Sequence, residues 1–143
     1  MSTYATTDEL QKRLAPYPGL LTLDDGSFDV ALAQAYLDSV EAEIDSCAAE
    51  RYVTPVEAPR AVSMLKNWAL TLAEELAHNA NVSHGETPDN VKARVKAVRD
   101  GMVSIREGEM SLIGADELPT SAGGMSEIDA DEPQMTRGKL GGW

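Results

Sequence analysis

The sequence predicts an all-α protein: a compact bundle of four to five helices with a long extended C-terminal tail. Three observations lead to this fold class. Apolar residues recur at spacings of three and four over long segments, as they do along one face of a helix. Aromatic residues make up only 5% of the chain while Ala, Leu and Val are plentiful, which favours helices over a β-sandwich. The 143 residues are enough for one domain with a single core.

The first helix is predicted from residue 7 to about residue 14. Thr6 followed by Glu9 fits a capping box, in which the hydroxyl and the carboxylate satisfy free amides of the first turn. Residues 15–19, Ala-Pro-Tyr-Pro-Gly, cannot continue the helical hydrogen bonds and end the helix. Residues 24–27, Asp-Asp-Gly-Ser, then form a turn.

A long second helix is predicted from Phe28 to about Tyr52, with Ser27 or Asp29 as its N-cap. Its apolar stripe is Phe28, Leu32, Tyr36, Val40, Ile44, Cys47 and Arg51. The opposite face carries Asp38, Glu41, Glu43, Asp45 and Glu50. The helix is therefore amphipathic and strongly acidic on its outer face.

The third helix is predicted from Pro59, a residue suited to the first helical position, to about Asn81. Its apolar stripe is Val62, Leu65, Trp68 or Ala69, Leu72 and Leu76. Trp68 is expected in the core.

The fourth helix is predicted to begin with Thr87 as cap and Pro88 as first residue, and to end at Gly108. Its apolar stripe is Val91, Val95, Val98, Met102 and Ile105. Gly101 interrupts it at some cost in helix propensity.

The chain is expected to divide into a helical domain, 1–108, and an extended C-terminal arm, 109–143. The arm is rich in Gly, Asp, Glu, Met, Ser and Pro, so we expect it to be disordered alone in water and ordered by assembly. Its aromatic and Met side chains are expected to be adaptable interface anchors. The predicted binding residues of the arm are Met125, Met135, Arg137, Lys139, Leu140 and Trp143. For Trp143, a tolerated end residue is the alternative.

Charge is segregated along the chain, whose formal net charge is −12. Acidic residues gather in the second helix and the arm, whereas the fourth helix is basic. One interpretation is that the acidic and basic segments form two separate solvent-exposed faces. The other is that copies stand side by side in a ring, with the acidic face of one copy against the basic face of the next. Such complementary charge sets the register and the choice of partner. The predicted inter-subunit residues are Asp38, Glu41, Asp45, Lys92, Arg94, Lys96 and Arg99.

The sequence offers no catalytic or metal site, and we expect no enzyme activity and no cofactor. The acidic turn at 24–27 lacks the glutamate that a calcium loop needs at its twelfth position, so a turn with a helix cap is expected. His78 and His84 do not have zinc spacing and are expected to line loops or the surface. Cys47 is expected to be a small core residue without a base beside it.

Nothing in the sequence indicates a signal peptide or a membrane span, so we expect a soluble intracellular protein, or a part of something assembled there, with no membrane partner. The single cysteine excludes a disulfide within the chain. The acidity argues against free binding to nucleic acid, because phosphate repels it.

The order of several short motifs resembles the Mu-like phage head-tail joining (neck) protein family, related to the head-completion connectors of tailed bacteriophages. The likeness covers about residues 3–113. The motifs are Tyr4-Ala5-Thr6, Asp8-Glu9-Leu10, Ile44-Asp45-Ser46, Ala49-Glu50-Arg51-Tyr52 with Pro55, a helix after Pro59, and Ile105-Arg106-Glu107-Gly108-Glu109. The chain departs from the family in its long acidic tail and in Cys47, where relatives often carry a bulkier residue.

The resemblance implies a helical virion protein at the head-tail junction, assembled in the host cytoplasm. Such an adaptor forms a ring, typically of about twelve copies, under the portal protein, and joins the capsid to the stopper or tail-terminator protein. Packaged DNA passes through the lumen without specific binding. The alternatives are a tail-completion or minor tail protein, and a DNA-binding regulator that uses the basic fourth helix.

Overall fold

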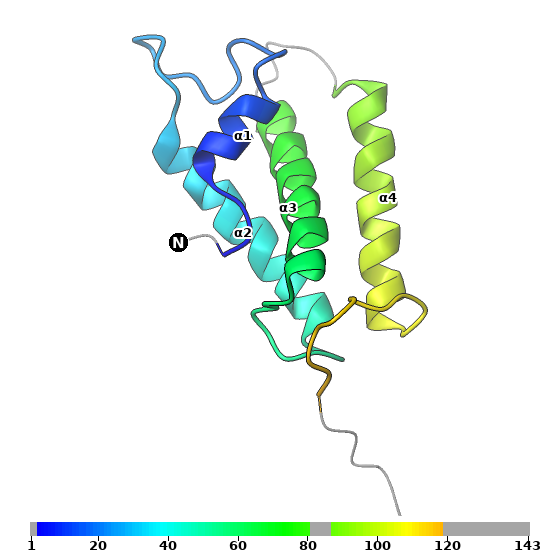
Figure 1. The fold of residues 1–143 in the computed structure, drawn as a ribbon. Coiled ribbons are helices and arrows are strands. Elements are labelled where there is room, and N and C mark those ends of the chain that lie inside the picture. The colour runs from blue at the N-terminus through cyan, green and yellow to red at the C-terminus, as the bar shows by residue number, and fades with distance from the viewer. Residues whose placement is uncertain (1–2, 81–86, 119–143) are drawn as a thin grey trace, which may run out of the picture.

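The computed structural model describes residues 3–80 and 87–118, and these form a helical bundle (Figure 1). Its helices are α1 (Thr7–Arg13), α2 (Val30–Ala48), α3 (Pro59–Ala80) and α4 (Asp89–Arg106). Within the described residues, extended pairing is limited to two isolated β-bridges. The predicted all-α class is therefore confirmed.

The start of α1 is held by the predicted capping box. The Glu9 amide donates to the Thr6 hydroxyl oxygen at 3.2 Å, and the Thr6 amide donates to a Glu9 carboxylate oxygen at 2.9 Å. The other Glu9 oxygen lies 2.9 Å from the Lys66 ammonium of α3. Hydrogen bonding from Lys66 lowers the pKa of the Glu9 carboxyl below its ordinary value. One carboxylate thus starts α1 and ties it to α3.

The bounds of α2 differ from the prediction at both ends. Asp29 is the N-cap, and its carboxylate accepts a hydrogen bond from the Leu32 amide at 3.0 Å. Phe28 therefore precedes the helix, and of the two predicted caps Asp29 is the correct one. At the other end the helix stops at Ala48 instead of near Tyr52. Tyr52 has left the helix because it forms a β-bridge with Glu117.

The face of α2 that enters the core also differs from the predicted stripe. The buried positions of α2 are Ala33, Leu37, Val40, Glu41, Ile44 and Ala48. Leu32, which was predicted to be part of the stripe, is exposed, and Tyr36 is only half-buried. In the first half of the helix the buried residues, Ala33 and Leu37, each lie one position after the predicted Leu32 and Tyr36. Apolar residues occupy both sets of positions, so their spacing alone does not decide which set faces the core.

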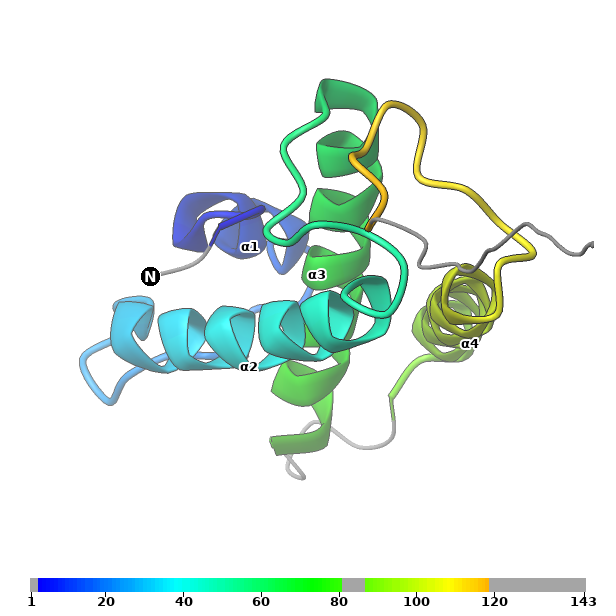
Figure 2. The same cartoon turned by 90° about the horizontal axis from the view of Figure 1, so that it is seen from below.

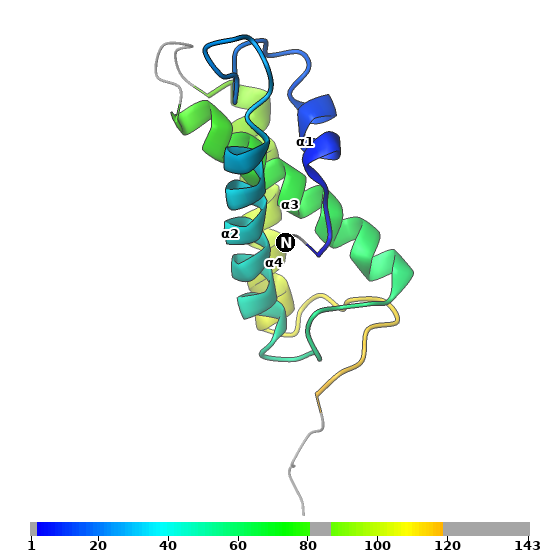
Figure 3. The ribbon, with the colours of Figure 1, turned by 90° about the vertical axis from the view of Figure 1, so that its left-hand side faces the viewer.

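α3 is the central helix of the bundle. It contacts α1, α2 and α4; in Figure 2 it lies between α1 and α4 and crosses α2, and Figure 3 shows it running obliquely to α2 and α4. Every residue from 68 to 74 is buried. The single predicted stripe is too narrow, because a helix with neighbours on several sides buries more than one face. Val62 and Leu76, at the edges of that stripe, are half-buried against the core.

The predicted apolar stripe of α4 is confirmed, because all five of its residues are buried. The start of the helix is different. Pro88 is the N-cap and Asp89 the first helical residue, so each lies one position later than predicted. The Thr87 hydroxyl does not cap α4 but donates to Asn79 Oδ1 near the end of α3 at 2.9 Å.

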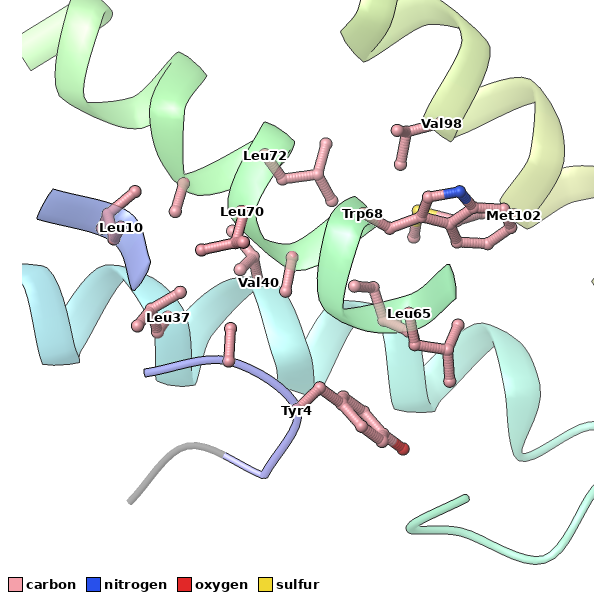
Figure 4. Close-up of a cluster of buried hydrophobic side chains, with 14 of the residues drawn as sticks. Tyr4, Leu10, Leu37, Val40, Leu65, Trp68, Leu70, Leu72, Val98 and Met102 are labelled. Atoms are coloured by element: carbon pink, nitrogen blue, oxygen red, sulfur yellow. The ribbon is translucent and has the colours of Figure 1, made fainter. Parts of the chain in front are cut away.

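Gly101 lies where α4 packs against Trp68 of α3. A Cβ atom at position 101 would lie 2.7 Å from Cζ2 of Trp68, closer than carbon atoms pack. Figure 4 shows the indole beside Val98 and Met102. Trp68 is buried as predicted, and the glycine that weakens α4 as an isolated helix makes room for it.

Packing continues beyond the end of α4. Leu112 is buried, and the connection between α2 and α3 pairs with the segment that follows α4. The Val53 amide donates to the Asp116 carbonyl at 2.8 Å, and the Leu118 amide donates to the Arg51 carbonyl at 2.9 Å. The described unit therefore reaches Leu118, past the domain end predicted at residue 108.

Candidate assembly surfaces

The acidic residues of α2 fall into two groups in the structure. Glu43 is exposed, as predicted for the outer face, and so is Glu50, which lies just beyond the end of α2. Asp38 is half-buried and accepts a hydrogen bond from Gln34 Nε2 at 2.9 Å. Asp45 is also half-buried. The acidic outer face is therefore narrower than the sequence indicates.

Glu41 does not lie on the outer face at all, which corrects its predicted place. Its side chain is only 4% exposed. The carboxylate accepts hydrogen bonds from the amides of Thr3, Tyr4 (3.0 Å) and Ala5 (2.9 Å). A buried carboxylate needs such donors to replace water. Glu41 thus fixes the start of the chain against α2.

Tyr4 makes a second connection at the same place. Its hydroxyl donates to Asp45 Oδ1 at 2.5 Å and accepts a hydrogen bond from the Val56 amide at 2.9 Å. Burial, followed by the hydrogen bond with Asp45, raises the pKa of Tyr4 above its ordinary value. One phenol therefore joins the start of the chain, α2 and the connection to α3.

The basic residues of α4 meet acidic partners within the same chain. Arg94 donates to both carboxylate oxygens of Glu74, at 2.9 and 3.3 Å. Arg99 pairs with Glu43 of α2 at 2.5 Å and with Glu75 of α3 at 3.6 Å. Lys96 pairs with Asp100 one turn along α4 at 2.9 Å, and Lys92 is exposed. The acidic and basic segments of the sequence thus come together inside one copy of the chain.

Glu74 is a charged core residue that the sequence interpretation missed. It is 1% exposed, on the face of α3 that meets α4. Besides Arg94, Arg13 lies 3.8 Å from its carboxylate. The hydrogen bond with Glu74 raises the pKa of Arg94 above its ordinary value, so the guanidinium stays charged. The sequence did contain a sign of a second, polar contact face on α3, because polar residues recur along it at helical spacing. They are Asn67, Thr71, Glu74 and His78.

His78 is also placed differently from the prediction, which put it in a loop or at the surface. It is buried on α3, with its ring edge-on to Tyr17 and the ring centroids 4.5 Å apart. The polar stripe of α3 therefore ends in an aromatic contact with the loop that follows α1.

The connection between α2 and α3 and the segment after α4 meet at the lower end of the bundle in Figure 1, and apolar side chains of both are exposed there. Ile113 is 63% exposed in the segment after α4, and Val53 and Leu118 are exposed in the paired segments. A pocket of about 170 Å³ lies between these segments. Its lining residues are Val53, Thr54, Pro55, Glu57, Ala58, Gly114 and Asp116. Clustered exposed apolar side chains of this kind are typical of contact surfaces.

The upper end of the bundle has a second group of exposed apolar side chains. Val30, at the first position of α2, is 55% exposed, and Leu23 and Leu32 are exposed as well. They accompany the loop between α1 and α2, which reaches the opposite end of the bundle from the paired segments (Figure 1). The molecule therefore presents apolar groups at both of its ends.

The predicted turn at residues 24–27 is present. The Asp25 carboxylate accepts hydrogen bonds from the amide and the hydroxyl of Ser27, at 2.9 and 2.6 Å. These bonds lower the pKa of Asp25 below its ordinary value. Among residues 3–80 and 87–118, no group of three potential metal-binding side chains comes together. Cys47 is half-buried against the core.

Several predicted features lie outside the described residues. They include His84 and the six binding residues of the arm, Met125, Met135, Arg137, Lys139, Leu140 and Trp143. Among the described helices, none is long and apolar enough to cross a membrane.

Comparison with known protein families gives one match. The model of the family described as Bacteriophage Mu, Gp36 matches residues 4–128, a range that includes α1 to α4 and both apolar ends. No curated protein matches the chain.

Proposed function

Since the chain belongs to the bacteriophage Mu Gp36 family, a family that indicates a phage structural or morphogenesis protein, we propose that it joins the phage head to the tail. In this role it is a head-to-tail adaptor. Copies form a closed ring of about twelve beneath the portal protein, extend the DNA channel, and bind the stopper or tail-terminator protein. The observation that carries the proposal is the family match across the whole bundle.

The two apolar ends of the bundle support an adaptor role. A protein that connects two different structures needs a contact surface for each of them. Val30 and Leu23 are exposed at one end, and Ile113 and Val53 at the other. Exposed apolar groups favour contact with a partner because association removes them from water.

The charges support passive passage of DNA more than DNA binding. We propose that the acidic face of α2, beyond whose end Glu50 faces solvent, lines or neighbours the DNA channel, where carboxylates repel phosphate so that DNA slides. A regulator that binds DNA through α4 would need its arginines for phosphate, whereas Arg94 and Arg99 already pair with carboxylates. A ring in which the α2 face is buried between copies or points outward would refute the lumen assignment.

The proposed function can be tested in a phage that lacks this protein. We expect filled heads and complete tails to accumulate separately, as seen by electron microscopy, and joining to be restored by adding the purified chain. Native mass spectrometry of the chain with its portal protein should then show a ring on the portal.

The outcomes separate the alternatives. Tails of abnormal length, or heads that already carry a complete neck, would instead indicate a tail-completion or minor tail protein. Normal particles with altered transcription would indicate a regulator. A salt-dependent shift of duplex DNA by the purified chain would support that last interpretation.

A further inference from the structure

The pocket at the lower end of the bundle has a shape and chemistry that fit one part of this chain. We propose that in the free protein it binds residues 135–143 of the same chain, with the indole of Trp143 in the pocket. Arg137 and Lys139 then lie against the acidic rim. The inference concerns the free chain and goes beyond its role in joining head and tail.

The size of the pocket suits an aromatic ring. Its volume is about 170 Å³, and an apolar protein cavity of roughly 150 Å³ holds a molecule of benzene. Val53, Pro55 and Ala58 supply apolar walls, and Thr54 adds a hydroxyl group. An indole is apolar over most of its surface and carries one N–H donor that needs an acceptor when buried.

The rim of the pocket supplies acceptors and negative charge. Glu57 and Asp116 line it and are exposed, and Glu117 follows in the same segment. A carboxylate here can accept the indole N–H, and the group as a whole attracts a cationic segment.

The residues beyond α4 hold one segment that matches this rim. Arg137 and Lys139 are the only basic residues of the chain after Arg106. They stand close to Trp143 and Leu140 in the sequence, so that two cations and two apolar side chains fall within a few residues. Residues 127–132, four of which are acidic, come before this segment, and the same rim would repel them.

The chain geometry favours docking within one molecule. The described residues end at Leu118, next to Glu117 on the paired segment that forms one side of the pocket. Sixteen residues, 119–134, separate Leu118 from the docking segment. Two sites joined within one chain by a connection of this length can meet at an effective concentration on the order of millimolar, so modest affinity is enough for docking in the same chain.

Docking would also cover exposed apolar groups. Ile113 and Val53 flank the pocket and are largely solvent-exposed in the bundle. An apolar segment laid beside them removes this surface from water until a partner competes for it. The free chain would in this way limit non-specific association through its lower end.

Fluorine NMR of the full chain labelled with 5-fluorotryptophan tests the proposal. The protein has two tryptophans, and a Trp143→Phe variant assigns their resonances. We expect the Trp143 resonance to have little sensitivity to exchange of H2O for D2O, as a buried indole does. The resonance of Trp68, which packs against Gly101, reports in the same spectrum whether the bundle is folded.

Two pocket variants and two controls give the decisive comparison. Val53→Ser weakens the apolar wall and Glu57→Lys reverses the charge of the rim, and each should cause loss of the protection of Trp143. Val30→Ser and Asp24→Lys make matching changes at exposed positions of the opposite end of the bundle and should leave the protection of Trp143 unchanged. Val53→Ser could also destabilise the bundle. Glu57 is exposed, so Glu57→Lys tests the pocket without disturbing the core.

Three results would overturn the proposal. A Trp143 resonance that responds fully to solvent in the unaltered chain excludes docking. Protection that survives both pocket variants places the indole elsewhere. Protection that disappears on dilution to micromolar protein, where an intramolecular contact persists, would show that the occupant belongs to a second copy.

Discussion

At the scale of single residues, Gly101 shows how one missing side chain decides the packing of two helices. The indole of Trp68 occupies the space that a Cβ at position 101 would need. Glycine costs an isolated helix about 1 kcal/mol relative to alanine. Tertiary packing therefore favours a residue that local propensity disfavours.

Replacing Gly101 by alanine tests which effect is larger. The gain in helix propensity is about 1 kcal/mol, whereas overpacking a core costs roughly 1–3 kcal/mol. We expect Gly101→Ala to lower the free energy of unfolding by about 1 kcal/mol, measured by chemical denaturation. In the double variant with Trp68→Phe the two losses should be less than additive, because the smaller ring makes room. A rise in stability for the single variant would contradict the packing argument.

Tyr4 provides a prediction about alkaline pH. Its raised pKa means that the neutral phenol is favoured in the folded chain, since burial and the bond to Asp45 disfavour the phenolate. As pH rises above the ordinary value of 10.0, the unfolded chain ionises first, so this contribution to stability is present below that pH and falls above it.

The Tyr4→Phe variant should isolate this effect. It loses the hydrogen bonds to Asp45 and Val56, which should cost about 1–3 kcal/mol at neutral pH. The difference in unfolding free energy between the unaltered chain and the variant should shrink above pH 10. Tyr36→Phe serves as a control, because Tyr36 is a half-buried tyrosine on α2. A difference that does not change with pH would show that the phenol does not titrate in this way.

At the scale of elements, α4 is held to the rest of the bundle by a polar contact as well as by its apolar stripe. Glu74 of α3 is buried, and Arg94 of α4 is its closest cation. Arg99 links α4 to Glu43 of α2 and to Glu75 of α3. These pairs orient α4, since an apolar stripe alone tolerates small rotations of a helix.

Removing Arg94 should destabilise the docking of α4. Breaking a buried ion pair costs about 3–5 kcal/mol, but Arg94 is partly exposed and Arg13 remains near Glu74, so we expect about 2 kcal/mol for Arg94→Ala. Amide hydrogen exchange should then be faster in α4 than in α3. The double variant Glu74→Met with Arg94→Leu should recover most of the stability, because no charge is left buried.

Lys96→Ala is the matched control for this prediction. Lys96 and Asp100 form an exposed pair on the same helix, and water and salt screen such pairs. We expect no measurable change in stability. If Arg94→Ala also left the free energy of unfolding unchanged, the pair of Arg94 and Glu74 would not be the contact that holds α4.

At the scale of the whole molecule, residues 51–53 pair with residues 116–118. A deletion after Leu118 makes the role of the remaining chain testable, because it spares every described contact. A deletion from Gly114 onward removes the pairing and part of the pocket. The two deletions therefore separate the function of the arm from the stability of the bundle.

Deletion of residues 119–143 should leave the bundle folded while heads and tails fail to join. We expect unchanged helical circular dichroism and thermal unfolding, together with loss of joining in the complementation assay. Deletion of residues 114–143 should in addition lower the thermal stability. If the shorter deletion still joins heads to tails, the arm is not needed for the proposed function.

How much of this molecule could be predicted depends on the range of the interactions involved. The all-α class, the capping box at Thr6 and the buried stripe of α4 follow from the sequence, because helical spacing and capping act within a few residues. Whether a residue at the edge of an apolar stripe is buried depends on the neighbouring helices. α2 shows this, since Ala33 is in the core and Leu32 is outside it.

The sequence by itself determined that this is an acidic, helical chain with segregated charge. These properties depend only on which residues occur within each segment and on their spacing. Only the tertiary structure decided which charges meet. It placed Glu41 against the start of the chain, Glu74 beside Arg94, and the basic face of α4 against acids of the same copy. Partners many residues apart are selected by how the helices cross, and a pattern read along one helix contains no information about that crossing.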